Sequence, residues 1–186
     1  MEKATLNYLY SELGKSDSEI ATFVGLDRTA LVKMRQRFSI ETRLSTGRIG
    51  ELKVIERLTH LFGKENVMDM NDSDATSEYD ILLNGTTKIE VKTSRQQRSN
   101  SRYYFTFSNP EEAGIKKTER VVVTPTNRTI KKMEESCDFV ILVFIGSTET
   151  DFLIVPSYDS LIKGKLTLST KNADQHPEFK GRWDLL

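Results

Sequence analysis

The sequence predicts an α/β domain over residues 41–186, preceded by a small all-α domain over residues 1–40. The first part shows only helical spacing of apolar residues, whereas the second combines β-rich runs with one long amphipathic helical pattern. A chain of 186 residues is long enough for one α/β core and a small satellite domain. The linker, residues 38–45, contains neither proline nor glycine, so we expect the two domains to pack together.

Residues 18–35 predict two short helices joined by a turn. Ala21 lets the helices cross closely, Gly25 takes the left-handed conformation at the turn, and Leu31 seals the contact. Asp27 is the expected N-cap of the second helix. A preceding helix around residues 5–13 supplies four further core side chains, Leu6, Leu9, Tyr10 and Leu13.

This spacing of alanine, glycine and an aliphatic residue resembles the helix-turn-helix of phage repressors and related DNA-binding domains. In such a module the second helix enters the major groove with its N-terminal residues on base edges. The resemblance therefore implies base contacts by Arg28, Thr29, Lys33 and Gln36, and phosphate contacts by Arg35 and Arg37. A plain three-helix packing domain or a dimerisation module could carry the same pattern, and both alternatives stay open.

The charges are balanced overall but unevenly distributed. With 27 basic and 27 acidic residues, the chain lacks the excess positive charge of an indiscriminate nucleic-acid binder. Six basic residues nevertheless lie in residues 28–48, against Glu41 within that stretch and Asp27 just before it. Four more lie in residues 92–102 without any acid. Local positive charge of this kind favours salt-sensitive contact with phosphates.

A β-hairpin is predicted at Asn84-Gly85. Residues 79–83 and 87–92 both read as strands, and Asn-Gly between such runs is the strongest short-range hairpin signal. Folding at this turn brings Asp80 level with Glu90.

The second strand of the hairpin places Glu90 and Lys92 on one face and Val91 on the other, because side chains alternate along a strand. Two carboxylates, of Asp80 and Glu90, then share a small area with one ammonium. Mg²⁺ prefers such hard oxygen ligands, and the bound ion can polarise a phosphodiester and lower the pKa of an attacking water. Lys92 would hold or deprotonate that water, or neutralise charge on the phosphorane. The alternative is a surface hairpin whose Lys–Glu pairs are merely solvated.

An amphipathic helix is predicted upstream, over residues 47–58. Its apolar stripe is Ile49, Leu52, Ile55, Leu58 and Leu61, and Glu51 lies near its start, off that stripe. With helix and hairpin together, the segment from Thr46 to the end resembles the PD-(D/E)XK nuclease superfamily. This is the fold of type II restriction endonucleases and archaeal Holliday-junction resolvases, in which a Gly-x-x-Gly-Glu helix often precedes the core hairpin.

The resemblance implies a restriction-endonuclease-like fold, with a mixed central sheet flanked by helices. It implies the catalytic set Asp80, Glu90, Lys92 and Glu51, and metal ligation by the carboxylates of Asp80, Glu90 and Glu51 and the carbonyl of Val91. It also implies Mg²⁺ as cofactor, with Mn²⁺ able to substitute, double-stranded DNA as partner, and a homodimer that cuts both strands. Tyr79 replaces the proline of the family pattern, a change that family members tolerate widely.

The polar segment 93–102 is expected to be a DNA-contacting loop beside this site, with Ser94, Arg95 and Gln96 nearest the metal. The alternative is an exposed connection without contacts. Residues 103–107 then predict a strand, the third of the sheet.

The C-terminal part predicts a surface helix over residues 127–135 and a central strand over the apolar run 139–145. Residues 151–155 pair with that strand as an outer hairpin closed by residues 146–148, and Pro156 ends it.

The lone cysteine, Cys137, precludes an internal disulfide and is typical of a reducing compartment. It borders the apolar run, which predicts a buried structural thiol. That run is too short to span a bilayer, and the N-terminus has no signal-peptide pattern. His60 and His176 have no spacing suited to zinc. We therefore expect a cytoplasmic protein without a membrane partner.

Together these features predict a Mg²⁺-dependent DNA endonuclease, with a type II enzyme of a restriction system preferred because a separate reading domain favours sequence-specific cutting. One alternative is a Holliday-junction resolvase or repair nuclease, in which the helical domain grips DNA structure. The other is a non-catalytic DNA-binding regulator on a nuclease scaffold, which would have no need of a buried cation site.

Overall fold

The computed structural model describes residues 2–13, 15–40, 44–74, 77–109, 121–123 and 129–186. The chain forms two compact units, residues 1–45 and 46–186, so the division falls five residues beyond the predicted boundary. No helix in the described ranges combines the length and the hydropathy that crossing a membrane requires.

The first unit consists of the helices α1 (Lys3–Ser11), α2 (Asp17–Val24) and α3 (Arg28–Arg37). Gly25 ends α2 in the left-handed conformation with a φ of 67°, and the Asp27 carboxylate accepts a hydrogen bond from the Thr29 amide at 2.7 Å. The predicted turn and cap are thus confirmed. Ser16 and Glu19 form a capping box at the start of α2. The buried core is Leu6, Tyr10, Ile20, Ala21, Leu31 and Ile40.

One predicted core residue of this unit is misplaced. The first helix ends at Ser11, and Leu13 follows it with 49% of its surface exposed. Its apolar character therefore contributes nothing to the core of the first unit.

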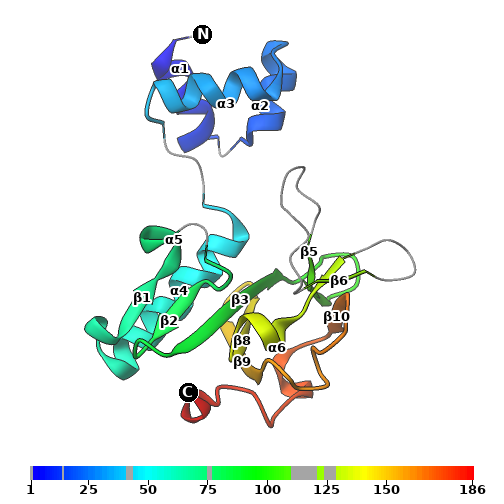
Figure 1. The fold of residues 1–186 in the computed structure, drawn as a ribbon. Coiled ribbons are helices and arrows are strands. Elements are labelled where there is room, and N and C mark those ends of the chain that lie inside the picture. The colour runs from blue at the N-terminus through cyan, green and yellow to red at the C-terminus, as the bar shows by residue number, and fades with distance from the viewer. Residues whose placement is uncertain (1, 14, 41–43, 75–76, 110–120, 124–128) are drawn as a thin grey trace. The chain divides into compact units, whose positions relative to one another are not determined.

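The second unit is built on a five-stranded mixed sheet of order β1-β2-β3-β8-β9 (Figure 1). The strands are β1 (Val67–Asp69), β2 (Ile81–Leu83), β3 (Thr87–Arg95), β8 (Phe139–Ile145) and β9 (Thr150–Pro156). β3 and β8 run parallel, and the other neighbours are antiparallel. This confirms the predicted mixed sheet and the predicted β8–β9 hairpin ending at Pro156.

The Asn84-Gly85 turn joins β2 to β3 as predicted. Asn84 and Gly85 have φ angles of 53° and 70°, the left-handed values that Asn and Gly tolerate best. Ile81 faces Ile89 across the hairpin, and this register sets Asp80 opposite Glu90.

Helix α4 (Thr46–Phe62) covers one face of the sheet. Its buried residues are Gly50, Val54 and Leu58, which recur every four positions. The predicted stripe is therefore wrong in part, because Leu52 and Leu61 are 38% and 42% exposed. The helix turns Gly50 toward β3 because a glycine allows the closest approach. A Cβ at Gly50 would lie 1.8 Å from the Thr93 Oγ1.

Strand β4 (Tyr103–Thr106) does not extend this sheet, contrary to the prediction that it is the third strand. It pairs with β10 (Thr167–Thr170) in a separate two-stranded sheet. The edge of β3 is taken by β8, which pairs with it over seven residues. Tyr103 and Phe105 of β4 pack instead on the face of the five-stranded sheet away from α4, where their rings meet the Phe144 ring edge-on at 5.0 and 4.8 Å.

A further correction concerns residues 127–135, of which 127 and 128 lie outside the described residues. In place of a surface helix, the chain forms β7 (Thr129–Lys131) and the single turn α6 (Met133–Ser136), in which Met133 is buried. β7 lies between β5 (Ser108–Asn109) and β6 (Val121–Val123) in a three-stranded sheet. Pairing with two strands from elsewhere in the chain overrides the local helical pattern.

The remaining elements are short and connect or complete these layers. They are η1 (Lys64–Asn66), α5 (Met70–Ser73), η2 (Ala173–Gln175) and η3 (Trp183–Leu185). Trp183 packs its ring edge-on against Phe152 at 5.3 Å. Cys137 is buried as predicted.

Candidate active site

The hairpin fixes the Asp80 carboxylate directly beside Glu90. The Asp80 amide donates to the Ile89 carbonyl at 3.0 Å, and its Oδ2 accepts a hydrogen bond from the Val91 amide at 2.7 Å. Backbone and side chain of Asp80 are thus both tied to β3. The predicted juxtaposition of Asp80 and Glu90 is confirmed.

Side chains of β3 alternate between two different surroundings. Ile89 and Val91 face α4, where they join the cluster that contains Val54 and Leu58. Glu90 and Lys92 point to the opposite face, because their partners Val140 and Leu142 on β8 belong to the other apolar cluster. The two charged residues thus lie on the face of the sheet away from α4.

The buried Glu90 carboxylate is held between two ammonium groups. Lys92 Nζ lies 2.5 Å from Glu90 Oε1, and Lys131 Nζ lies 2.7 Å from Glu90 Oε2. Lys131 also donates to the backbone carbonyl of Glu78. Lys131 is therefore a site residue that the sequence analysis missed.

The reason for the omission is the wrong assignment of residues 127–135. On a surface helix Lys131 would point to solvent. The β-branched pair Thr129-Ile130 is the local signal for a strand, but no local pattern reveals that this strand ends beside Glu90, 41 positions away along the chain.

The pKa values of Asp80 and Glu90 are shifted in opposite directions. Burial, followed by the charge of Glu90, raises the pKa of Asp80 to about 7, against the lowering effect of the Val91 amide and of Lys92. Burial also acts to raise the pKa of Glu90, but the charges of Lys92 and Lys131 outweigh it, and the net pKa is lowered. Likewise burial acts to lower the pKa of Lys92, but the Glu90 charge raises it overall. Glu90 and Lys92 are therefore charged at neutral pH, and Asp80 is close to its midpoint.

Glu51 is not brought into contact with this cluster. Its carboxylate pairs with Arg48 at 3.1 Å and accepts a hydrogen bond from Nδ2 of the Asn71 side chain at 2.9 Å. Arg48 in turn pairs with Asp69 at 2.6 Å. The Glu51 charge does reach Asp80, where it is the weakest of the influences that raise the pKa, after burial and Glu90.

The donor chemistry of Asp80 and Glu90 fits a magnesium ion. Within the described ranges no group of three or more His, Cys, Asp or Glu side chains could hold a metal. Mg²⁺ is commonly held by one or two carboxylates, with water and substrate phosphate completing its coordination. Two crowded carboxylates, one with a raised pKa, carry the negative charge that such an ion neutralises. Ligation by Glu51 and by the Val91 carbonyl stays a prediction.

The predicted DNA-contacting segment is partly a strand, because β3 continues through Arg95. Ser94 is buried, and its Oγ accepts a hydrogen bond from the Tyr104 amide at 2.9 Å. Arg95 and Gln96 are exposed. Arg95 Nε donates to the Thr46 hydroxyl at 3.2 Å, at the start of α4. The exposed part of the predicted segment is thus residues 95–101, and Arg102 is half-buried. Ser94 instead forms a buried hydrogen bond to the backbone of β4.

In the first unit, five of the six predicted DNA-contacting residues of α3 are exposed: Arg28, Thr29, Lys33, Gln36 and Arg37. Arg35 is half-buried, with its Nε 3.3 Å from an Asp17 carboxylate oxygen and its guanidinium 5.9 Å from the centre of the Tyr10 ring. It ties α3 to α1 and α2, so a phosphate contact by Arg35 would compete with these contacts.

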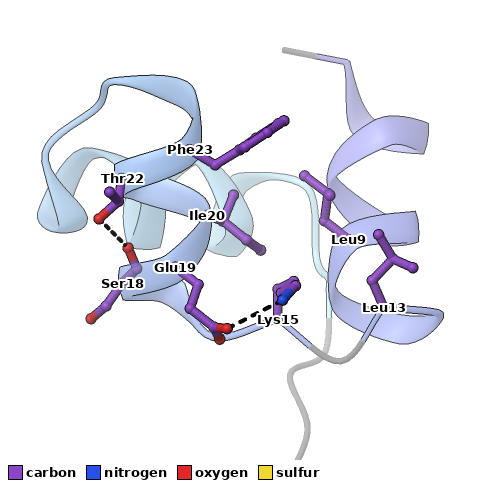
Figure 2. Close-up of a pocket in the computed structure, with 8 residues that line it drawn as sticks. All are labelled: Leu9, Leu13, Lys15, Ser18, Glu19, Ile20, Thr22 and Phe23. Carbon is purple, nitrogen blue, oxygen red and sulfur yellow. Dashed lines mark hydrogen bonds and ion pairs between the residues drawn. The ribbon is translucent and has the colours of Figure 1, made fainter.

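A groove of about 520 Å³ lies on the same unit, on α1, α2 and the segment between them (Figure 2). Its lining is mainly apolar, with Leu9, Leu13, Ile20 and Phe23, and Phe23 is 81% exposed. Among the described residues α3 lines none of it, so the groove and the predicted DNA-contacting residues are separate features.

No family model and no curated protein matches this chain. Among solved structures, the bacterial homing endonuclease I-Ssp6803I is similar, with a TM-score of 0.52 and 16% identity over 75% of this chain and 89% of that chain. A restriction endonuclease in complex with substrate DNA matches with a TM-score of 0.35 and 23% identity. That match covers 66% of this chain and 51% of the restriction endonuclease chain. The second likeness is too slight to carry an argument. The first shows that this chain has a fold found in an endonuclease.

Proposed function

We propose that this protein is a DNA endonuclease that depends on Mg²⁺, with Mn²⁺ able to replace it. The observation that carries the proposal is the cluster on one hairpin of Asp80, the buried Glu90 and Lys92, with the Asp80 pKa raised to about 7. Perturbed pairs of titratable groups of this kind concentrate at functional sites. The fold shared with a homing endonuclease supports the same conclusion.

In the proposed reaction Asp80 and Glu90 hold the ion, and the Val91 amide keeps the Asp80 carboxylate oriented. The bound ion supplies polarisation of the phosphodiester and a water of lowered pKa. Lys92 is an ammonium beside Glu90, because the pKa of Lys92 is raised. Lys92 therefore acts as a hydrogen-bond donor. In this role it orients the attacking water or neutralises the charge on a phosphate oxygen.

The proposed substrate is double-stranded DNA, cut at a specific sequence by a type II restriction endonuclease. Exposed basic and amide side chains on α3 are of the types that read guanine and adenine in the major groove, which supports a helix-turn-helix role for the first unit. We also propose a homodimer, in which each copy cuts one strand with its own Asp80, Glu90 and Lys92.

The test is digestion of a long phage DNA with and without Mg²⁺, followed by sequencing of the fragment ends. The variants are Asp80→Ala and Lys92→Ala, with Lys88→Ala as the matched control, since Lys88 lies exposed on the same strand. We expect discrete fragments that require Mg²⁺, Asp80 and Lys92 but not Lys88.

Three other outcomes would revise the proposal. Undiminished cutting by the Asp80 and Lys92 variants would overturn the active-site assignment. Cutting of four-way junctions in preference to linear duplex would indicate a resolvase. Binding of DNA without cleavage of any substrate would indicate a regulator on a nuclease scaffold.

A further inference from the structure

Both oxygens of the Glu90 carboxylate are occupied by cationic groups of the protein itself. Lys92 contacts Oε1 and Lys131 contacts Oε2, at 2.5 and 2.7 Å. Only 7% of the Glu90 side chain is exposed, so these contacts replace almost all of its hydration. A divalent cation that takes Glu90 as a ligand must therefore compete with these two ammonium groups for the negative charge of the carboxylate, and like-charge repulsion opposes its approach.

The two lysines are not equivalent in how easily they can leave. Lys92 lies two residues from Glu90 on the same strand and face, which keeps its ammonium beside the carboxylate. Lys131 comes from β7 and contacts a second acceptor, the Glu78 carbonyl. When Lys131 releases Glu90, its ammonium stays hydrogen-bonded, whereas an unpaired buried charge would be costly. Lys131 is thus the group that can move with least loss.

We propose that Lys131 is a positioning residue that competes with the divalent cation for Glu90. Without the ion, Lys131 holds the carboxylate in place and neutralises it. Once the ion has bound, the freed ammonium is available to a phosphate of the DNA. Cation binding then becomes weak without DNA and stronger with it, because phosphate supplies both the missing ligands and a new partner for Lys131. This inference rests on the proposed function.

The test is calorimetric titration of Mn²⁺ into the full-length protein without DNA, which measures cation affinity and not cleavage. The variants are Lys131→Met and its polar alternative Lys131→Gln, and both remove the competing charge. Lys132→Met is the matched control, because the neighbouring Lys132 pairs with Glu135 at 2.9 Å. Circular dichroism checks that each variant is folded.

We expect Mn²⁺ to bind the two Lys131 variants on the order of tenfold more tightly than the wild type, since a positive charge next to the ligand is removed. Lys132→Met should bind like the wild type. Lys131→Arg, which keeps the charge, should bind as weakly as the wild type. A purely structural role of Lys131 would not tighten cation binding.

One outcome would overturn the role of Lys131: the wild type binds Mn²⁺, and both folded Lys131 variants bind it equally or more weakly. The proposed nuclease site would then stay intact. Failure of every variant and of the wild type to bind Mn²⁺, with and without DNA, would overturn the metal site itself. Glu90→Gln distinguishes binding at this site from binding elsewhere, because it should abolish the tight binding of Lys131→Met when the two are combined.

Discussion

Substitution of Gly50 by alanine tests how α4 is seated on the sheet. The added Cβ would lie 1.8 Å from the Thr93 Oγ1 and 2.8 Å from both its Cβ and its Cγ2, whereas ordinary van der Waals contact begins at 3.4 Å. A rotation of the Thr93 side chain moves the hydroxyl and the methyl but leaves its Cβ in place. Relief therefore requires a shift of the α4 or β3 backbone.

The expected cost follows from two opposing contributions. Alanine in place of glycine favours a helix by about 1 kcal/mol, and overpacking a tight contact costs about 1–3 kcal/mol, occasionally more. Because the clash of Gly50→Ala involves a stiff β-branched side chain in the central strand, we expect the upper part of that range. The net loss is about 2 kcal/mol, equivalent to a fall in Tm of about 4–8 °C.

The assay is urea denaturation followed by circular dichroism, on Gly50→Ala, Thr93→Gly and the double variant. Thr93→Gly removes all three clashing atoms, so the double variant should recover about 1–2 kcal/mol relative to the sum of the single effects. Thr93→Ala should recover less, since its Cβ remains. Glu56→Ala, on the exposed face of α4, should change stability by no more than about 0.5 kcal/mol. A Gly50→Ala protein as stable as the wild type would refute the reasoning.

Two further predictions concern titrating groups. Because the pKa of Asp80 is raised to about 7 in the folded protein and is near 4 in an unfolded chain, the folded state retains a proton that the unfolded state loses. In metal-free buffer the free energy of unfolding should therefore fall between pH 4 and 7 in the wild type but less in Asp80→Asn. A wild-type urea midpoint that is the same at pH 5 and at pH 8 would contradict this. Burial raises the pKa of Cys137 to about 12, so its thiol should react with iodoacetamide at pH 8 far more slowly in the native protein than in urea.

Local patterns in the sequence were sufficient for the elements whose partners are close in the chain. The Asn84-Gly85 turn and the alternation along 87–92 predicted the hairpin that sets Asp80 beside Glu90, and the register confirms it. The α2–Gly25–α3 turn was predicted for the same reason. Turn chemistry and side-chain period act within a few residues, so a single sequence displays them directly.

Contacts between distant segments were decided only by the tertiary structure. The pairing of β3 with β8 joins residues 50 positions apart and leaves β4 to form its own sheet with β10. The same long-range packing turns Gly50 toward Thr93 and leaves Leu52 partly exposed. An apolar residue on a helix shows that some face is buried, but which face is set by the shape of the sheet beneath it.

The composition of the candidate site shows the same division. Asp80, Glu90 and Lys92 belong to one hairpin, and the sequence alone determined that these three residues lie together. Lys131 reaches Glu90 through a strand whose own partners are β5 and β6, and Glu51 turns to Arg48 and Asn71. Coulomb interactions in water fade over about 10 Å, so an ion pair forms only between charged groups that the fold brings within a few ångströms of each other. For groups far apart in the chain, that distance is a property of the folded structure.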